Sequence, residues 1–164
     1  MTTTRFDIFT LERAFPAALE RVYAAFADPQ RKRRWFADSP SHEVEHFAMQ
    51  FDVGGREQTR YRFRAGTPFA GTALESEGVF LDILPQRRIV SASTMAIGGQ
   101  RISASVQTFE FFEHDGGTRL LFTHQAAFFE GADGPEIRRA GWEQLLNQLS
   151  DRLRDRQSQP GERS

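Results

Sequence analysis

The sequence predicts an α+β fold in which a curved antiparallel sheet of about six or seven strands wraps around a long C-terminal helix. Three observations predict it. Strand-like runs separated by glycine turns fill residues 43–127, two short helical stretches follow the first strand, and the chain closes with a long amphipathic helix. A sheet that curves around one helix buries the apolar faces of both, so we expect a single domain over residues 1–156.

The first strand and helix follow from polarity patterns near the N-terminus. Residues 4–13, "TRFDIFTLER", partly alternate in polarity and predict a strand. "PAALERVYAAFA", residues 16–27, predicts a helix with Pro16 in its first turn. Its apolar residues recur at helical spacing and form one buried stripe: Leu19, Val22, Tyr23 and Phe26.

A second helix of about two turns is predicted in "DPQRKRRWF". Asp28 can cap it, Pro29 suits its first position, and Ser39-Pro40 ends it. The cations at 31–34 occupy all sides of so short a helix, so we interpret them as a solvated face and expect no nucleic-acid binding. The rings of Trp35 and Phe36 are then the functional part of this segment.

The strand region shows alternation and turn signals. In "REQTRYRFRAG", arginines at 60, 62 and 64 alternate with Tyr61 and Phe63, which predicts one wet face and one buried aromatic face. Gly54-Gly55, Gly98-Gly99 and 115–117 mark tight turns. Such turns give an antiparallel meander.

The last helix is predicted in "GPEIRRAGWEQLLNQLSDRLRDR". Its wide apolar stripe combines two rows: Arg138, Trp142, Leu145 and Leu149 with Ile137, Leu146 and Leu153. At about 20 residues it is long enough to cross the sheet. We expect the polar residues 157–164 to form a disordered tail.

Composition limits the function. The chain has 164 residues, a net charge of −1 and no cysteine, so disulfide and thiolate chemistry are excluded. The N-terminus does not resemble a signal peptide, and no apolar run of about 20 residues occurs, so we expect a cytoplasmic protein without stable membrane association. Sixteen Phe against two Tyr and two Trp predict a Phe-packed core, a hollow core lined by rings, or both.

Five strings in this order resemble the SRPBCC or START-like helix-grip superfamily, and within it the branch of homologs of the activator of the heat-shock chaperone ATPase. They are "RAFPAALERVYAAFADPQRKRRWF", "FDVGGREQTRYRF", "GVFLDILPQRRIVSAS", "GGTRLLFTHQAAF" and "GWEQLLNQLSDRL", across residues 5–155. The resemblance implies the helix-grip fold and a Trp, here Trp35, near the mouth of a cavity. The superfamily includes lipid and hormone carriers, cyclases and chaperone co-factors. Eukaryotic activators carry an additional N-terminal domain, for which this chain has no room.

Three polar residues are candidates for chemistry. His124 shares a strand face with Leu120 and Phe122, so it points inward if Leu120 is core. It is then a general acid–base group, a ligand contact or a structural hydrogen-bonding group. Gln107 likewise points inward if Phe109 does. Asp82 either pairs with an inward His124 or is a solvated carboxylate on the other face.

Metal binding is not expected. His42 and His46 lie four apart in an extended segment, which places them on one strand face, and His114 lies in a turn. None of this resembles the spacing of metal ligands. No motif for a cofactor is present, so we expect none.

Three functions remain open. The leading hypothesis is binding of a small, mostly hydrophobic ligand between the sheet and the last helix. Its expected contacts are Trp35, Phe36, Tyr61, Phe63, Gln107, Phe109, Phe122, His124 and Trp142. The second is a cyclase- or hydrolase-type enzyme that uses His124 as acid–base in the same pocket. The third is a protein partner, such as a chaperone ATPase, a regulator or a second copy of the chain, docked on an exposed apolar patch. Phe128 and Phe129 are the candidates for such a patch, or they fold down onto the last helix.

Overall fold

Seven strands form one antiparallel sheet in the order β1-β7-β6-β5-β4-β3-β2. The structure, a computed structural model, describes residues 3–67 and 69–158. The strands are β1 (Arg5–Phe15), β2 (His42–Met49), β3 (Arg56–Phe63), β4 (Ala73–Leu84), β5 (Arg88–Ile97), β6 (Gln100–His114) and β7 (Gly117–Phe128). The helices are α1 (Leu19–Ala27), α2 (Pro29–Lys32) and α3 (Pro135–Ser158), and a π-helical turn, η1 (Arg33–Ala37), continues α2.

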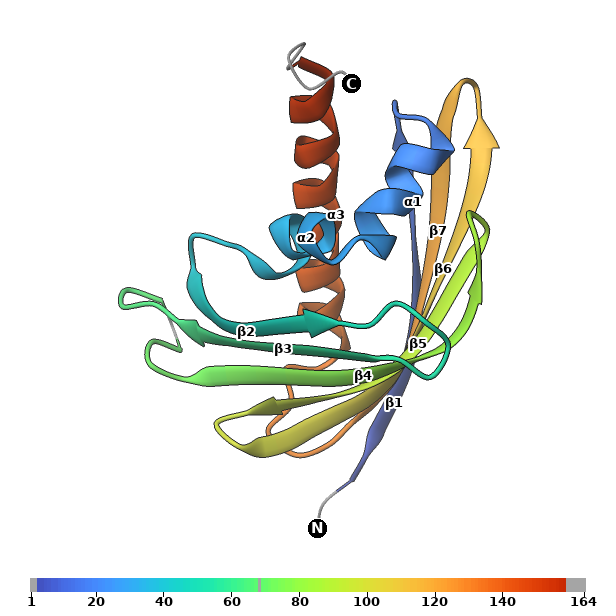
Figure 1. The fold of residues 1–164 in the computed structure, drawn as a ribbon. Helices are drawn as coiled ribbons and strands as arrows, with labels where there is room; N and C mark the ends of the chain where they lie inside the picture. The colour runs from blue at the N-terminus through green and yellow to red at the C-terminus, as the bar shows by residue number, and fades with distance from the viewer. Residues whose placement is uncertain (1–2, 68, 159–164) are drawn as a thin grey trace.

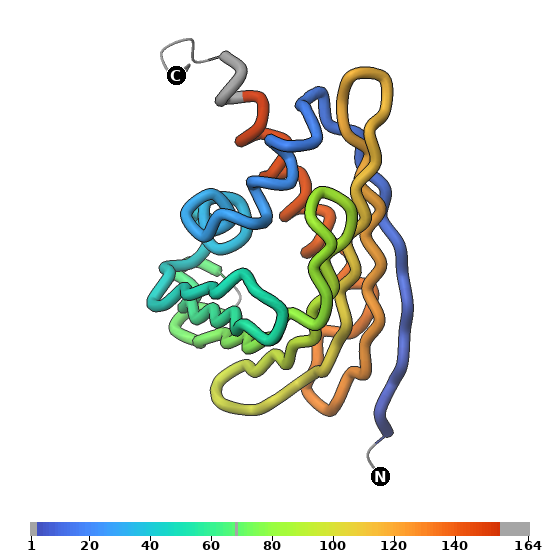
Figure 2. The backbone as a smooth tube through the Cα atoms, turned by 45° about the vertical axis from the view of Figure 1, so that its right-hand side comes forward, coloured from blue at the N-terminus to red at the C-terminus, as the bar shows by residue number. Residues whose placement is uncertain are grey.

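The sheet curves around α3, and α1 and α2 lie on the same concave side (Figure 1). In Figure 2 the blue β1 runs beside the orange β7, although the two are far apart in sequence. The α+β fold with a long C-terminal helix and two short helices after the first strand is therefore confirmed.

The start of α1 differs from the prediction. The helix begins at Leu19, because Ala18 has extended backbone angles (φ −60°, ψ 149°), and Pro16 precedes it. The Thr118 hydroxyl donates to the carbonyl of Ala17 at 2.8 Å. This bond holds the extended connection between β1 and α1 against β7. The expected stripe is confirmed, with Val22, Tyr23 and Phe26 buried.

The second helix begins as predicted. The Asp28 carboxylate accepts hydrogen bonds from the backbone N–H groups of Gln30 (2.9 Å) and Arg31 (3.4 Å), which caps α2. The turn that follows widens to a π-helix, in which the N–H of Asp38 donates to the carbonyl of Arg33 at 2.9 Å. In η1 the side chains therefore no longer follow the spacing of an α-helix, which changes which of them face the sheet.

Phenylalanine rings fill the end of the molecule nearest α1. The ring of Phe26 lies 5.0–5.1 Å from those of Trp35, Phe109 and Phe111. Leu146 and Leu149 of α3 close this core from the other side and are fully buried. Roughly 1.5–3 kcal/mol is gained for each such side chain removed from water. This part of the molecule is the packed core that the Phe-rich composition predicts.

The hairpin turn between β5 and β6 has the residues that its geometry needs. Gly98 and Gly99 both have positive φ (59° and 86°) between β5 and β6, as a two-residue turn of the mirror-image type requires.

At the C-terminus, α3 extends to Ser158, and the rest of the expected tail, residues 159–164, lies outside the described residues. Among the described residues, no helix is both long and apolar enough to cross a membrane.

Candidate ligand-binding cavity

A cavity of about 390 Å³ lies between the concave face of the sheet and the N-terminal half of α3. Ring-bearing side chains from four elements line it: Phe36 of η1, Tyr61 and Phe63 of β3, Phe109 of β6 and Trp142 of α3. The predicted contacts Gln107 and His124 also line it. The structure thus brings seven of the nine expected contacts to one hollow.

Trp35 and Phe122 are the two expected contacts that lie elsewhere. Trp35 is fully buried, and its indole N–H donates to the carbonyl of Ala25 at 2.8 Å, so it belongs to the core between α1 and α3. Phe122 is also fully buried, stacked on Phe109 with ring centroids 4.6 Å apart and covered by Trp142 at 4.5 Å. Trp142 and Phe109 contact the cavity, and Phe122 supports them from behind.

The mouth of the cavity is lined by exposed apolar side chains. Phe69, in the β3–β4 connection, is 56% exposed, and Ile137, on the first turns of α3, is 63% exposed. Gly141, one turn further along α3, also lines the cavity, and a Cβ added there has no neighbouring atom within 4 Å. The exposed Phe69 and Ile137 thus border the cavity beside an open position at Gly141.

A network of small polar side chains forms the floor. Gln107 accepts a hydrogen bond from the Ser91 hydroxyl at 3.1 Å and donates through its amide to Ser93 at 3.1 Å. It also donates to Ser105. Gln107 is therefore inward and buried, as predicted, and its hydrogen-bonding groups are satisfied by neighbouring strands.

His124 is the exception among these polar groups. It is 1% exposed and stacks on Phe9 with ring centroids 4.8 Å apart. Neither ring nitrogen has a hydrogen-bond partner within the described part of the chain. Burial, with a smaller contribution from the charge of Arg138, lowers the pKa of His124 to about 4. The imidazole is consequently neutral at pH 7 and has one donor and one acceptor that no described residue satisfies.

Asp82 does not pair with His124. Its carboxylate accepts from the guanidinium of Arg88 at 2.9 Å on the outer face of the sheet. The cause is a β-bulge in β4: Phe80 pairs with Ser91, but Asp82 pairs with Val90. The extra residue between them turns Asp82 outward, so the proposed acid–base dyad does not form.

Lys32 was expected on a solvated face, and this prediction is wrong. Its ammonium lies inside the cavity wall, 2.5 Å from the Glu57 carboxylate and 4.7 Å from the centre of the Phe36 ring. Their side chains are 7% and 17% exposed. One signal in the sequence could have identified this pair. Glu57 shares the strand face of Tyr61 and Phe63, and an acid on an aromatic inner face needs a cationic partner.

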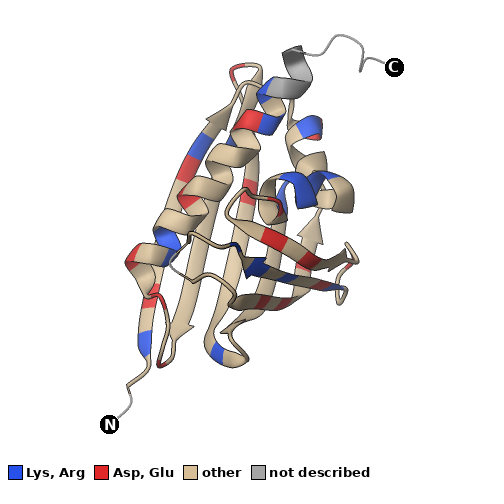
Figure 3. Cartoon of the chain, turned by 90° about the vertical axis from the view of Figure 1, so that its left-hand side faces the viewer, with Lys and Arg blue, Asp and Glu red and all other residues tan. Residues whose placement is uncertain are grey.

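Three other cations of this region form ion pairs near the surface. Arg60 and Arg62 both bind Glu45 of β2, at 2.8 and 3.0 Å, and Arg33 binds Asp38 at 3.4 Å. Figure 3 shows the blue positions on α2 and β3 next to red positions on β2. Positive charge is thus interspersed with negative charge here.

His42 and His46 do not share a strand face. His42 is buried in the cavity wall and stacks on Tyr61 at 3.6 Å, and burial lowers its pKa. His46 is exposed, with a ring nitrogen 3.4 Å from the amide oxygen of Gln58. A β-bulge between Val44 and His46 places the two histidine side chains on opposite faces of the strand. No cluster of three metal-ligating side chains occurs within residues 3–67 and 69–154.

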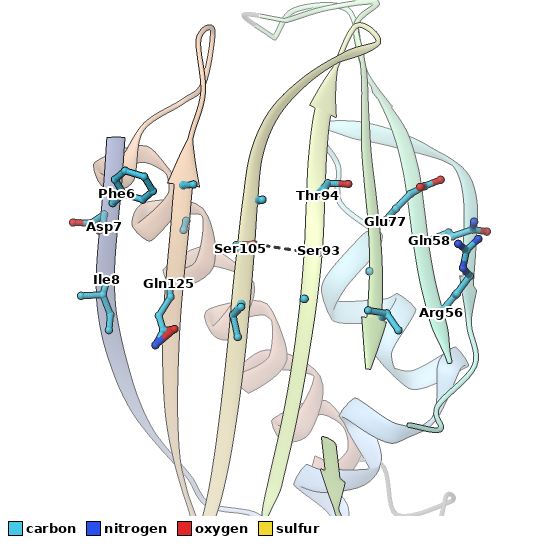
Figure 4. Close-up of a pocket in the computed structure, with 17 residues that line it drawn as sticks. Phe6, Asp7, Ile8, Arg56, Gln58, Glu77, Ser93, Thr94, Ser105 and Gln125 are labelled. Carbon is cyan, nitrogen blue, oxygen red and sulfur yellow. Dashed lines mark hydrogen bonds between the residues drawn. The ribbon is translucent and has the colours of Figure 1, made fainter. Parts of the chain in front are cut away.

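A second hollow, the outer trough, lies on the convex face of the same sheet. Figure 4 shows Phe6 and Ile8 of β1 on one side of it and Arg56, Gln58 and Glu77 on the other. It is open, with a volume of about 940 Å³, and Phe6 and Ile8 are 78% and 62% exposed.

The apolar patch expected at Phe128 and Phe129 is absent. Phe128 is buried beneath the Arg138 guanidinium, which lies 5.1 Å from its ring centre, and Phe129 is half-buried. Exposed apolar side chains lie instead in the outer trough, at Phe6 and Ile8, and beside the cavity, at Phe69 and Ile137.

The chain is similar to several solved bacterial proteins over almost its whole length. The protein Mll3558 from Rhizobium loti is 38% identical, with a TM-score of 0.82, and the match covers 92% of this chain and 99% of that one. A protein from Rhizobium leguminosarum is 31% identical, with a TM-score of 0.85 and coverage of 94% and 99%. An AHSA1-like protein from Aeromonas hydrophila, at 19% identity and a TM-score of 0.69, covers 96% and 99% and shares the fold.

A comparison with curated proteins finds no match. The family model described as "Activator of Hsp90 ATPase homolog 1-like protein" matches residues 16–154, which is most of the chain. The resemblance seen in the sequence is thereby confirmed, and the chain belongs to this AHSA1-like family within the helix-grip fold.

Proposed function

We propose that this protein binds a small, mostly hydrophobic ligand in the cavity between the sheet and α3. The observation that carries the proposal is a ring-lined hollow of about 390 Å³ beside a core that is otherwise filled with phenylalanine. Ligand pockets are typically concave, largely apolar and about 300–1,000 Å³ in volume, with a few polar groups that orient the ligand. Gln107, His124 and the Lys32–Glu57 pair are such groups.

A substitution that places a large side chain at the edge of the cavity tests this proposal. Gly141→Trp places a large ring where the structure has open space, and helix stability does not suffer because glycine is itself a poor helix former. The matched control is Ala140→Trp, at the adjacent exposed position of α3, which does not line the cavity. We expect the neutral dye N-phenyl-1-naphthylamine to fluoresce with the parent chain and with Ala140→Trp, and its signal to be lost with Gly141→Trp. Equal dye binding by all three proteins would refute the cavity as the site.

Native mass spectrometry of protein from its natural host then identifies the ligand. Spectra recorded under gentle and under denaturing conditions are compared. A mass difference that disappears on denaturation gives the mass of the bound molecule. The Gly141→Trp variant, prepared in the same way, is expected to carry no such mass.

The cyclase- or hydrolase-type alternative uses the same cavity. A general acid–base residue must lie within hydrogen-bonding reach of the atom that it protonates. Within the described part of the chain His124 has no polar partner, so only a substrate atom would serve as one. Ligand binding needs no such additional step and therefore comes first.

Modulation of a chaperone ATPase is the second candidate, and the outer trough favours it. The family description names activators of the Hsp90 ATPase, and Phe6 and Ile8 offer exposed apolar contacts on the convex face. The test is the ATPase rate of an Hsp90-type chaperone with the parent chain and with a Phe6→Ser/Ile8→Ser variant. A rate that neither protein changes would refute this candidate.

A further inference from the structure

The ring of His124 lies beside the cavity, and its two buried nitrogens have no hydrogen-bond partner among the described residues. The residue is 1% exposed. Along the strands, its cross-strand neighbours are Phe9 of β1 and Gln107 of β6. Phe9 offers only a ring face, and the Gln107 amide is already bound to serines. Buried polar groups are normally satisfied, so the missing partner has to come from a ligand or from water.

The remaining charged groups of the cavity are already paired. Lys32 binds Glu57. Arg138, which also lines the cavity, donates to the Asp133 carboxylate through two hydrogen bonds of 2.8 Å. Arg138 also donates to the Ser103 hydroxyl at 2.9 Å. Among the described residues that line the cavity, no lysine or arginine is therefore left to neutralise an anion. An unpaired carboxylate in such a site would lose its hydration without compensation.

From these two observations we infer that the ligand is an uncharged molecule whose apolar, ring-sized skeleton carries a hydroxyl or carbonyl oxygen bound to His124. This inference rests on the proposed ligand-binding function and narrows it to neutral alcohols, phenols and ketones, with carboxylates excluded. A neutral imidazole donates to a carbonyl, and it both donates to and accepts from a hydroxyl. The low pKa of His124, about 4, supports the inference, because the ring carries no positive charge that would attract a carboxylate at pH 7.

Three probes with one skeleton test the inference: naphthalene, 2-naphthol and 2-naphthoate. Dissociation constants are measured by calorimetry or NMR titration at pH 7 with the parent chain. A hydrogen bond to a neutral group is worth a factor of about three to ten in affinity. We expect 2-naphthol to bind more tightly than naphthalene by this factor, and 2-naphthoate to bind more weakly than either.

Variants at His124 assign the preference to this side chain. His124→Phe keeps a flat ring on Phe9 and is expected to lose the preference for 2-naphthol, with naphthalene affinity within about twofold of the parent. His124→Gln keeps a donor and an acceptor and is expected to retain the preference. The matched control His46→Phe changes an exposed histidine outside the cavity and is expected to alter none of the three constants.

The outcomes separate the two proposals. If 2-naphthoate binds most tightly, or if His124→Phe keeps the preference for 2-naphthol, the inference about the ligand is wrong while the cavity remains a binding site. If the parent chain binds all three probes no better than the plugged Gly141→Trp variant, the ligand-binding function itself is wrong.

Discussion

The inner and outer faces of the sheet differ, over one part of it, in a way that departs from the usual pattern of antiparallel sheets. Over the middle of β5, β6 and β7 the inner face is polar: Ser91, Ser93, Ser105, Gln107 and His124. The outer face of the same strands is mostly apolar, with Ala92, Ala104, Val106 and Ala127 beside Thr94 and Gln125. A sheet with one solvated face normally has apolar residues inside and polar residues outside.

The polar positions on the inner face distinguish the part of the interior that is packed core from the part that lines the cavity. Towards α1 the inner face becomes apolar, with Ile89, Phe109, Phe111 and Phe122 packed against helices. Serines, an amide and an imidazole follow on the inner face where the cavity lies. Polar inner positions of this kind are stable only when they are paired or when a ligand pairs them. The following predictions test this division, from the largest expected effect to the smallest.

The buried Lys32–Glu57 pair in the cavity wall is expected to stabilise the fold far more than the half-exposed Arg60–Glu75 pair on the outer face. Removing one partner of a buried pair leaves an uncompensated charge, which costs about 3–5 kcal/mol. Glu57→Gln should therefore lower the free energy of unfolding by about 3 kcal/mol, measured by urea denaturation. Glu75→Gln, which breaks the half-exposed pair with Arg60, should cost less than about 1 kcal/mol. Similar losses for both would erase the distinction between the two faces.

The free energy of unfolding is expected to decrease as the pH is lowered through the range in which His124 titrates. Its pKa is about 4 in the folded chain against an ordinary value of 6.5, so between these values the unfolded chain binds the extra proton. Stability is lost as pH falls from about 6.5 to about 4, by up to roughly 3 kcal/mol, and this contribution is constant below that range. Arg138 and Asp133 are the charged groups that act on the ring, and Arg138 has the larger influence.

His124→Phe isolates that contribution from the effect of other groups, such as His42, whose pKa is also lowered. Denaturation curves of both proteins between pH 4 and 7 are compared. The variant should lose about 3 kcal/mol less than the parent over this range. Parallel curves would mean that His124 is not buried in its neutral form.

At pH 7 the same substitution should stabilise the protein. Leaving a buried polar group without a partner costs about 1–3 kcal/mol, and a phenyl ring of similar shape removes this cost. We expect His124→Phe to raise the free energy of unfolding by about 1–2 kcal/mol. His46→Phe, on the exposed side, should change it by less than about 0.5 kcal/mol. A destabilised His124→Phe would indicate that the imidazole is already satisfied in the folded chain.

Substitutions in the outer trough should have the smallest effects on the domain. Phe6 and Ile8 are mostly exposed, so Phe6→Ser and Ile8→Ser should each change stability by less than about 0.5 kcal/mol in thermal or urea denaturation. Binding of the neutral dye should be unchanged, because the trough and the cavity are on opposite faces of the sheet. Loss of dye binding in either variant would place the apolar site on the outer face.

The sequence predicted the sheet, the order of elements and the inward facing of Gln107 and His124, because alternation and turn residues are local signals. It did not predict the facing of Asp82 or His46. Each follows a β-bulge, and one extra residue exchanges the two faces of a strand. Bulges depend on pairing with another strand, which is not visible in the segment itself.

The burial of Trp35 and the inward position of Lys32 were missed for a related reason. Both lie in or next to a π-helical turn, where ordinary helical spacing no longer relates position to direction. Their environment also depends on distant residues. The Gln148 amide donates to the carbonyl of Trp35 at 2.7 Å, and Glu57 attracts Lys32 from β3. These contacts join segments that are far apart in the chain.

The serine floor has a consequence for how this scaffold can be changed. Its small side chains bond mainly to one another and to Gln107, while the phenylalanine core that stabilises the fold lies at the other end of the same strands. Because these serines satisfy the buried amide of Gln107, the size and polarity of the floor are altered with least effect on folding when bonded partners are replaced together. A protein engineer could therefore treat the floor as an adjustable module and develop receptors of different selectivity from one stable framework.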